Sequence, residues 1–282
     1  MNMHKFTIIT VNYNNAHGLR LTIESVVKQC YRNFEYIVID GGSTDGSVDV
    51  IKDYQNEIDY WVSEQDEGIY NAMNKGILLS HGEYLNFMNS GDTFFSDTVL
   101  ENVARQTNEA QIIWGNTCYQ FKNKRYTEFN ENSPVTMLAL EAWGSINHQA
   151  TFIRRDLFST ELYDESFKIF ADYDFFLKKM VYENCSVKRI EDIIVSYNTD
   201  GISANASTRE MRMQERKRAQ RKYFPERVVQ DYFYLRPFSM HPDFLNLMHS
   251  IAEKKYLFPI VFYVNRLLLK SYLLVKNFIA LR

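Results

Sequence analysis

The chain has 282 residues, of which 45% are hydrophobic and 15% aromatic, and its formal net charge is −3. A chain of this length and composition buries a sizeable core, which excludes an intrinsically disordered protein. The slightly negative charge argues against a general nucleic-acid-binding protein, because such proteins carry an excess of basic residues.

The cysteines point to a reducing compartment. There are three, Cys30, Cys118 and Cys185, and they are scattered without CxxC spacing. Such thiol usage is not that of a disulfide framework. The amino-terminal apolar run is too short for a signal-peptide core, and no small-residue cleavage site follows it. We therefore expect a cytoplasmic enzyme body.

Strands and helices alternate through the first part of the chain. Short β-branched runs predict buried strands, and the stretches between them carry apolar residues on one face, as amphipathic helices do. The predicted strands are 6–11, 34–39 and 60–63, and the predicted helices lie around 19–30 and 47–55. This alternation indicates a parallel sheet with right-handed crossovers. The sequence GGSTDG follows the second strand and is not G-x-G-x-x-G, so a Rossmann dehydrogenase is disfavoured.

The stretch 63–92 contains the candidate site. An acidic loop, Glu64-Gln65-Asp66-Glu67-Gly68, leads into a predicted helix whose apolar residues recur at three- and four-residue steps. Residues 83–88 then predict a buried strand that runs directly into Asn89-Ser90-Gly91-Asp92. Ligands of α/β proteins bind at the carboxyl ends of the strands, so Asp92 is expected at the open edge of the sheet.

Three segments resemble family 2 glycosyltransferases of the GT-A fold: the run DEGIYNAMNKGI (66–77), the strand that begins GEYL, and Asn89-Ser90-Gly91-Asp92. The resemblance covers roughly residues 5–200. It implies an α/β GT-A fold with a mixed, mainly parallel central sheet flanked by helices. It also implies transfer of a sugar from a nucleotide-diphosphate donor with inversion at the anomeric carbon.

The resemblance assigns the nucleoside to the ends of the first two strands. The nucleotide-binding residues it implies are Thr10, Asn12, Tyr13, Asp40, Asp66, Asn89, Ser90 and Gly91. The first three would line the base and ribose. Asp40 would accept from ribose hydroxyls or a base N–H, and Asp66 would face the base. Taken singly, Asp40 and residues 12–15 are also ordinary turn residues, but their joint occurrence at strand ends favours a binding site.

Asp92 is the metal ligand that the resemblance implies. A divalent cation, Mn²⁺ or Mg²⁺, would neutralise the charge that develops on the departing diphosphate. Family members carry an Asp-x-Asp motif here, whereas this sequence retains one acid, and Asn89 offers only a neutral oxygen. The alternative is a capped turn before the next helix.

A polar triplet, Asn147-His148-Gln149, precedes another predicted strand. Family members carry a similar His-Gln pair facing the donor phosphates, so the resemblance assigns His148 and Gln149 to the diphosphate and acceptor region. His148 would ligate the metal or donate to the diphosphate. A lone histidine is more often a structural hydrogen-bonding residue, which is the alternative.

Asp172 is the general base that the resemblance implies. It lies in Phe170-Ala171-Asp172-Tyr173-Asp174 at the start of a predicted helix, where family members usually carry Glu-Asp. The base would take the proton of the acceptor hydroxyl during attack on the anomeric carbon. The alternative for Asp172 is an ordinary helix N-cap, which is compatible with catalysis. Asp174 is the rival base and is assigned to the acceptor side.

The carboxyl-terminal part differs in composition. Residues 208–222 predict a basic helix, and beyond Glu253 basic residues punctuate an aromatic and aliphatic run. Its charges argue against a membrane span and favour a helix lying on an anionic membrane surface. The alternative is a helix packed on the catalytic domain or on a second copy in a homodimer. We expect a catalytic domain at 1–205 and a basic, amphipathic helical extension at 206–282.

We therefore expect a peripheral enzyme on the inner face of the cell membrane. Similar chains with the Asn-Ser-Gly-Asp ending belong to capsule, O-antigen and colanic-acid assembly, so the resemblance implies a saccharide or lipid-linked saccharide acceptor in bacterial surface polysaccharide biosynthesis. A sugar nucleotidyltransferase would need a glycine- and arginine-rich loop after the first strand, and VNYNNAHG has none. The remaining alternative is a catalytically silent relative that acts as a scaffold in a polysaccharide-assembly complex.

Overall fold

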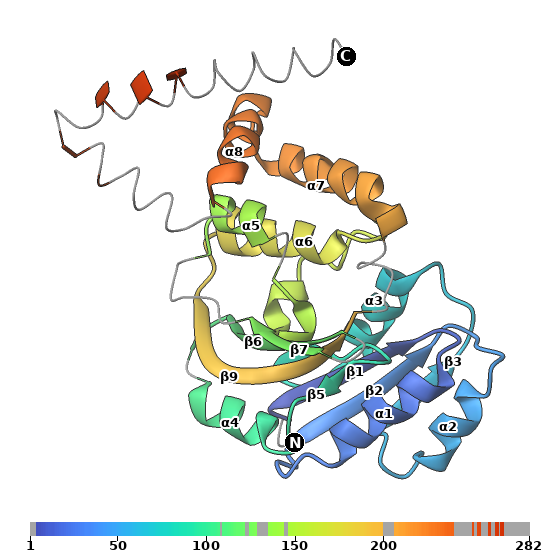
Figure 1. Cartoon of the computed structure of the whole chain (residues 1–282). Coiled ribbons are helices and arrows are strands. Elements are labelled where there is room, and N and C mark those ends of the chain that lie inside the picture. Colours follow the sequence, from blue (N-terminus) through green and yellow to red (C-terminus); the bar gives the residue numbers. More distant parts are fainter. Residues whose placement is uncertain are drawn as a thin grey trace.

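The computed structural model describes residues 4–107, 109–121, 124–128, 135–143, 146–199 and 206–239, and beyond them positions 250, 253–254, 259–260, 263–264 and 266–267. Within these ranges the chain forms one nine-stranded sheet flanked by helices (Figure 1). The strands are β1 (Phe6–Asn12), β2 (Phe34–Asp40), β3 (Tyr60–Ser63), β4 (Tyr84–Phe87), β5 (Thr93–Phe94), β6 (Ile112–Phe121), β7 (Lys124–Glu128), β8 (Thr151–Arg154) and β9 (Val187–Asn198).

The α-helices are α1 (Ala16–Val27), α2 (Ser47–Asp53), α3 (Ile69–Leu79), α4 (Val99–Gln106), α5 (Met137–Trp143), α6 (Ala171–Phe176), α7 (Arg209–Tyr223) and α8 (Glu226–Ser239). A π-helical segment, η3 (Leu177–Tyr182), continues α6, and the short helices η1 (His148–Ala150) and η2 (Arg155–Phe158) flank β8. The predicted strands and helices of the first ninety residues are confirmed, with ends that shift by up to three positions.

The sheet has a parallel half and a mixed half. Its strand order is β3-β2-β1-β4-β8-β6-β9-β5, with β7 paired to β6. Strands β1 to β4 are mutually parallel, whereas β8 runs antiparallel to β4. The carboxyl ends of β1 to β4 and the amino end of β8 therefore meet at one edge, and the segments that follow or precede them converge there.

Helices cover both faces of the parallel half, and β1, β2 and β4 are buried along almost their whole length for that reason, whereas the edge strand β3 is partly exposed. Because side chains alternate along a strand, Ile9 packs with α3 and α6, whereas its neighbour Ile8 packs with α1, α2 and α4. Figure 1 accordingly shows α6, α7 and α8 on the side of the sheet opposite α1, α2 and α4.

The basic helix predicted at 208–222 is confirmed as α7, and it packs on α6. Ala219 of α7 is fully buried in the same core as Phe175 and Phe176 of α6. The domain boundary expected at 205 and most of the aromatic run beyond 253 lie outside the described residues. Within the described part of the chain, no helix has the length and apolar character needed to cross a membrane.

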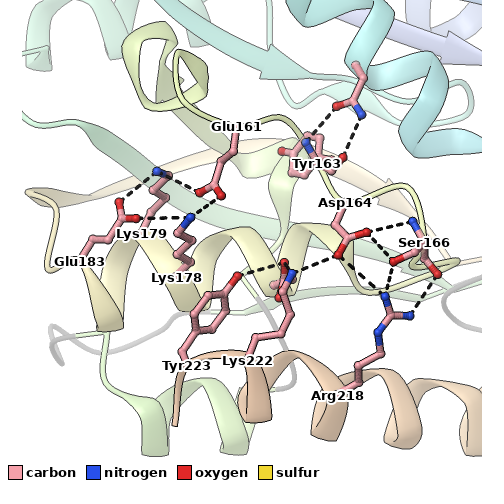
Figure 2. A network of polar contacts seen from close by, with 12 residues as sticks. Glu161, Tyr163, Asp164, Ser166, Lys178, Lys179, Glu183, Arg218, Lys222 and Tyr223 are labelled. Atoms are coloured by element: carbon pink, nitrogen blue, oxygen red, sulfur yellow. Dashed lines mark hydrogen bonds and ion pairs between the residues drawn. The ribbon is translucent and has the colours of Figure 1, made fainter.

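Ion pairs join α7 to the segment before α6. The Lys222 ammonium lies 2.6 Å from a carboxylate oxygen of Asp174 and 3.1 Å from one of Asp164, and Arg218 reaches Ser166 (Figure 2). The Asp174 side chain is only 7% exposed. Burial raises the pKa of this carboxyl above its ordinary value, and the hydrogen bonds from Lys222 and Tyr223 partly oppose that rise.

We expect Lys222→Met to destabilise the fold by about 2 kcal/mol at neutral pH, because it leaves the Asp174 carboxylate buried without its nearest cation. This decrease in the free energy of unfolding should become smaller as the pH falls through the raised pKa of Asp174, because the protonated carboxyl needs no cation beside it. Urea unfolding at pH 5 and pH 7.5 measures both effects.

The matched control is Lys52→Met, which removes an exposed lysine 3.8 Å from Asp49. Exposed pairs contribute little, so this variant should unfold like the parent protein at both pH values. Equal stability of the Lys222→Met and Lys52→Met variants would show that the α7 ion pair does not stabilise the fold.

Candidate active site

The candidate site lies at the shared edge of β1 to β4. Asn12, Asp40 and Ser63 are in register with one another at the ends of β1, β2 and β3. Asn89 follows β4, and His148 precedes the antiparallel strand β8 at the same edge. The parallel topology thus brings together residues that are up to 136 positions apart in the sequence.

Asp40 ties the strand ends together. It is fully buried, and its two oxygens accept four hydrogen bonds, from Asn12 Nδ2 (2.7 Å), Ser63 Oγ (2.6 Å) and both the hydroxyl and N–H of Ser43 (2.6 and 2.9 Å). Burial raises the pKa of Asp40, but hydrogen bonds from Ser43, Ser63 and Asn12 outweigh it and hold the pKa below its ordinary value. Its direct contact with a nucleoside stays a prediction.

Tyr13 and Asp66 lie together beyond the end of β2. A Cβ built on Gly41 would come within 2.6 Å of Asp66 Oδ2 and 3.2 Å of Tyr13 Cδ2, so this position requires glycine. The Tyr13 ring is 67% exposed. Asn12 Oδ1 is buried and has no hydrogen-bond partner within the described residues. An exposed ring beside free acceptor atoms is a suitable surface for a nucleoside.

Thr10 differs from the other predicted nucleotide ligands. It is fully buried two residues before the strand end, and its hydroxyl lies 3.0 Å from the Tyr36 hydroxyl. This position disfavours the predicted contact between Thr10 and the nucleoside. Thr10 shares a face of β1 with Asn12 but lies further from the strand end, where its hydroxyl is already paired with Tyr36 in the core. The sequence showed only that Thr10 lies near the strand end.

Asn89, His148 and Asp172 form a hydrogen-bonded chain. The Asn89 amide nitrogen lies 3.0 Å from His148 Nε2, and His148 Nδ1 lies 2.9 Å from Asp172 Oδ2. When Asn89 donates, Nε2 accepts, and Nδ1 carries the proton that it donates to Asp172. The His148 and Asp172 side chains are each 13% exposed, so both are nearly withdrawn from water.

The second oxygen of Asp172 is also held. Asp172 Oδ1 accepts from the Tyr173 N–H at 2.8 Å and lies 3.2 Å from the Tyr70 hydroxyl, which also donates to the Ile169 carbonyl at 2.5 Å. Sequence reasoning missed Tyr70, because nothing in the local pattern of α3 connects it to a residue 102 positions later. From the sequence alone, Tyr70 could not be distinguished from an aromatic residue that only packs in the core.

Asp92 lies beneath this chain. It is 5% exposed, and its two oxygens accept from Gln149 Nε2 at 2.7 Å and from the Asn198 N–H at 2.8 Å. Burial raises the pKa of Asp92 to about 7, although the bonds from Asn198 and Gln149 favour the ionised form. The residue therefore joins the start of β8 to the end of β9.

The chain itself offers few ligands for a divalent cation. Within the described residues, no group of three or more His, Cys, Asp or Glu side chains gathers to hold a metal. Gly91 has φ of +101°, a left-handed conformation that glycine adopts without strain. Asn89 Oδ1 is buried without a hydrogen-bond partner in the described region and is the oxygen that best fits a cation.

The remaining predicted residues divide into two groups. Ser90 and Gly91 lie at the edge, where the Ser90 carbonyl accepts from Asn15 Nδ2 at 3.2 Å. Asp174 lies elsewhere: it faces α7 and pairs with Lys222, so the structure disfavours its predicted roles as rival base and acceptor contact. Two positions further along a helix place a side chain on the opposite face, which separates Asp174 from Asp172.

Solved structures share this architecture. The crystal structure of S. aureus TarS 1–349 in complex with UDP-GlcNAc matches with a TM-score of 0.64 and 18% identity, over 89% of this chain and 74% of that one. The mannosyltransferase PcManGT from Pyrobaculum calidifontis in complex with GDP-Man and Mn²⁺ matches with a TM-score of 0.61 and 14% identity, over 95% and 81%. The fold is that of GT-A glycosyltransferases, which confirms the predicted fold class.

The family follows from sequence comparison. The profile described as Glycosyl transferase family 2 matches residues 7–178, more than half of the chain, and the chain belongs to this family. A PGL/p-HBAD biosynthesis glycosyltransferase of Mycobacterium bovis (strain BCG / Pasteur 1173P2) is 28% identical over 207 residues, which cover 71% of this chain and 79% of the relative. The protein is therefore a glycosyltransferase, as its sequence predicts.

We expect Asp92→Asn to remove a pH dependence of stability. With the folded pKa raised to about 7 and an unfolded value of about 3.9, the folded state retains a proton that the unfolded state releases. The free energy of unfolding then falls as the pH rises from about 4 to 7, by up to about 1.4 kcal/mol per pH unit. Asparagine is neutral throughout, so the variant should gain stability relative to the parent between pH 5 and pH 8.

Thermal unfolding from pH 5 to pH 8 measures this difference. Asp49→Asn, in which the lost carboxylate is 84% exposed, is the control and should follow the parent curve. Parallel curves for the parent and Asp92→Asn across this range would mean that the pKa of Asp92 is not raised.

Proposed function

We propose that this glycosyltransferase moves a sugar from a nucleotide-sugar donor to an acceptor hydroxyl with inversion, and that Asp172 is the general base. The bond between the anomeric carbon and the diphosphate oxygen breaks as the new bond forms, and the nucleoside diphosphate leaves. The observation that carries the proposal is the hydrogen-bonded chain from Asn89 through His148 to Asp172, at the edge where β1, β2 and β4 end. It joins the predicted base to the segment at which the donor diphosphate is expected.

The proposed mechanism is a single displacement. The acceptor oxygen attacks the anomeric carbon from the face opposite the nucleotide, and Asp172 takes the hydroxyl proton as the new bond forms. His148 and the Tyr173 N–H each donate to one oxygen of Asp172, so they orient the carboxylate toward the acceptor side. This is the base and orienting-partner arrangement found in other catalytic constellations.

The donor site is proposed to extend from Tyr13 to Asn89. The exposed Tyr13 ring would stack on the base, with Asp66 beside it, and the free Oδ1 of Asn12 would accept from the ribose. The similar proteins of known structure were solved with UDP-GlcNAc and with GDP-Man, which supports a nucleotide-sugar as the donor class.

A divalent cation, Mn²⁺ or Mg²⁺, belongs to the proposal. It would neutralise the diphosphate as the sugar departs, and the related mannosyltransferase structure contains Mn²⁺. Asn89 Oδ1 would hold it, with Asp92 contributing if it releases one of its two hydrogen bonds. The diphosphate would supply the charged ligands, as is common for Mg²⁺ sites.

A thermal-shift screen of UDP, GDP, CMP and dTDP, each with and without Mn²⁺, tests donor binding. One nucleotide should raise the unfolding temperature, with a larger rise when Mn²⁺ is present, because ligand at 100 times its Kd stabilises by about 2.7 kcal/mol. With the matching donor, Asp172→Asn should lower turnover on the order of 100-fold or more while nucleotide binding persists.

Asp156→Asn, which changes an exposed acid of η2, is the control and should keep full turnover. A parent protein that binds none of the four nucleotides and turns over none of the common donors would favour the scaffold alternative. Full turnover by Asp172→Asn would remove the base assignment alone.

The acceptor is proposed to be a saccharide or lipid-linked saccharide of a bacterial surface polysaccharide, reached at the inner membrane surface. Positions 259–260, 263–264 and 266–267 are helical, and Ile260, Tyr263, Val264 and Leu267 are 48–63% exposed. Their spacing of three, one and three residues aligns them on one helix face, and Arg266 lies beside them. An exposed apolar face next to basic residues suits an anionic lipid surface.

We expect the full chain to float with vesicles containing phosphatidylglycerol and to remain unbound with phosphatidylcholine alone, because the basic residues require anionic lipid. A chain ending at Glu253 and the double variant Ile260→Asp, Tyr263→Asp should both lose flotation. If the truncated chain floats as well as the full one, the membrane proposal is wrong.

A further inference from the structure

The segment that leads into α6 is held from two sides. On one side it is hydrogen-bonded to α3. Asn74 donates to the Tyr163 carbonyl at 2.9 Å and accepts from the Tyr163 N–H at 3.0 Å, and it also donates to Glu165 at 2.7 Å. The Tyr70 hydroxyl of α3 donates to the Ile169 carbonyl at 2.5 Å. Figure 2 shows the opposite side, where Arg218 and Lys222 of α7 approach Asp164 and Ser166.

Glu215 of α7 binds the backbone of this segment directly. Its carboxylate accepts from three consecutive backbone N–H groups, those of Lys168 (2.7 Å), Ile169 (2.9 Å) and Phe170 (3.0 Å). The residue is 8% exposed. Charge-assisted bonds of this kind are roughly twice as strong as neutral ones, and burial removes water as a competitor.

These three N–H groups end at the start of α6. Phe170 is the N-cap residue, and its aromatic side chain cannot accept a hydrogen bond from the first turn. A capping side chain at position 170 would normally order this segment. Here Glu215, which lies on α7, holds it instead. Asp172 follows two residues after Phe170, in the first turn of α6.

The neighbours of Glu215 on α7 hold the same turn. Arg216 lies over the rings of Phe170 and Tyr173, at 5.4 and 5.6 Å from their centroids, and Gln220 donates to the Tyr173 hydroxyl at 2.9 Å. The backbone before Asp172 and the side chains of Phe170 and Tyr173 on either side of it thus contact α7.

We propose that Glu215 is a positioning residue that sets the place of Asp172 relative to the acceptor hydroxyl, an inference that rests on the proposed role of Asp172 as general base. Without the Glu215 carboxylate the backbone at 168–170 loses its three bonds, and the first turn of α6 shifts. A displacement of about 1 Å at a catalytic group costs roughly 100-fold in rate. Nucleotide binding should persist, because Asn12 ends β1 and Tyr13 and Asp66 follow β1 and β3, away from the backbone at 168–170 that Glu215 holds.

The test is Glu215→Gln, which keeps the shape but turns an NH₂ group toward N–H donors. It should lower kcat for sugar transfer 10- to 100-fold and leave the donor KM and nucleotide Kd within twofold of the parent values. Glu215→Asp keeps the charge and should restore part of kcat. Glu210→Gln makes the same charge change on the exposed face of α7 and should keep full kcat.

Amide hydrogen exchange followed by mass spectrometry gives a readout independent of activity. Exchange at 168–172 should rise in Glu215→Gln and stay unchanged in Glu210→Gln. If Glu215→Gln does not fold, Glu215→Asp carries the test, with a lowered kcat at an unchanged donor KM as the expected result.

Three outcomes would overturn the proposal: unchanged exchange at 168–172, a kcat equal to that of Glu210→Gln, or a loss of nucleotide binding in step with kcat. Loss of nucleotide binding together with kcat would show that Glu215 has a general structural role.

The Asp172→Asn variant distinguishes a failure of the positioning proposal from a failure of the proposed function. If Asp172→Asn retains turnover, the base assignment falls and the positioning role with it; if it is inactive and Glu215→Gln is not, only the positioning role falls.

Discussion

The parallel pairing of β1 to β4 is the constraint on which the site depends. Parallel strands expose their carboxyl ends at one edge, so Asn12, Asp40, Ser63 and Asn89 meet there although long segments separate them in the sequence. The antiparallel insertion of β8 beside β4 brings His148 to the same edge. The proposed donor site uses Asn12 and Asn89, which this pairing brings to the same edge.

Buried carboxylates hold that edge together, and the number of their donors decides their charge. Asp40 and Asp92 are both buried, yet the pKa of Asp40 is lowered and that of Asp92 is raised to about 7. Asp40 accepts four hydrogen bonds and Asp92 accepts two. Four donors replace the lost hydration of a carboxylate, whereas two do not outweigh desolvation. Hydrogen bonding thus favours the ionised form of Asp40, whereas burial favours the protonated form of Asp92.

The basic helix α7 packs against α6, the helix that carries Asp172. Ala219 lies in the core shared with α6, and Glu215 binds the segment directly before Asp172. The high charge of α7 made it resemble a solvated appendage, because charged residues are mostly found at surfaces. In the fold several of these charges are paired instead with acids of the 161–174 segment, as Lys222 is with Asp164 and Asp174.

The sequence by itself determined the strand–helix alternation, the family and the cluster of polar residues at strand ends, because these depend on local periodicity and on short motifs. Only the tertiary structure decided which of these polar groups face the open edge. It turned Thr10 into the core and Asp174 toward α7, and it connected His148 to Asp172. The reason is physical: hydrogen bonds and burial join residues distant in the chain, and no local pattern records such partners.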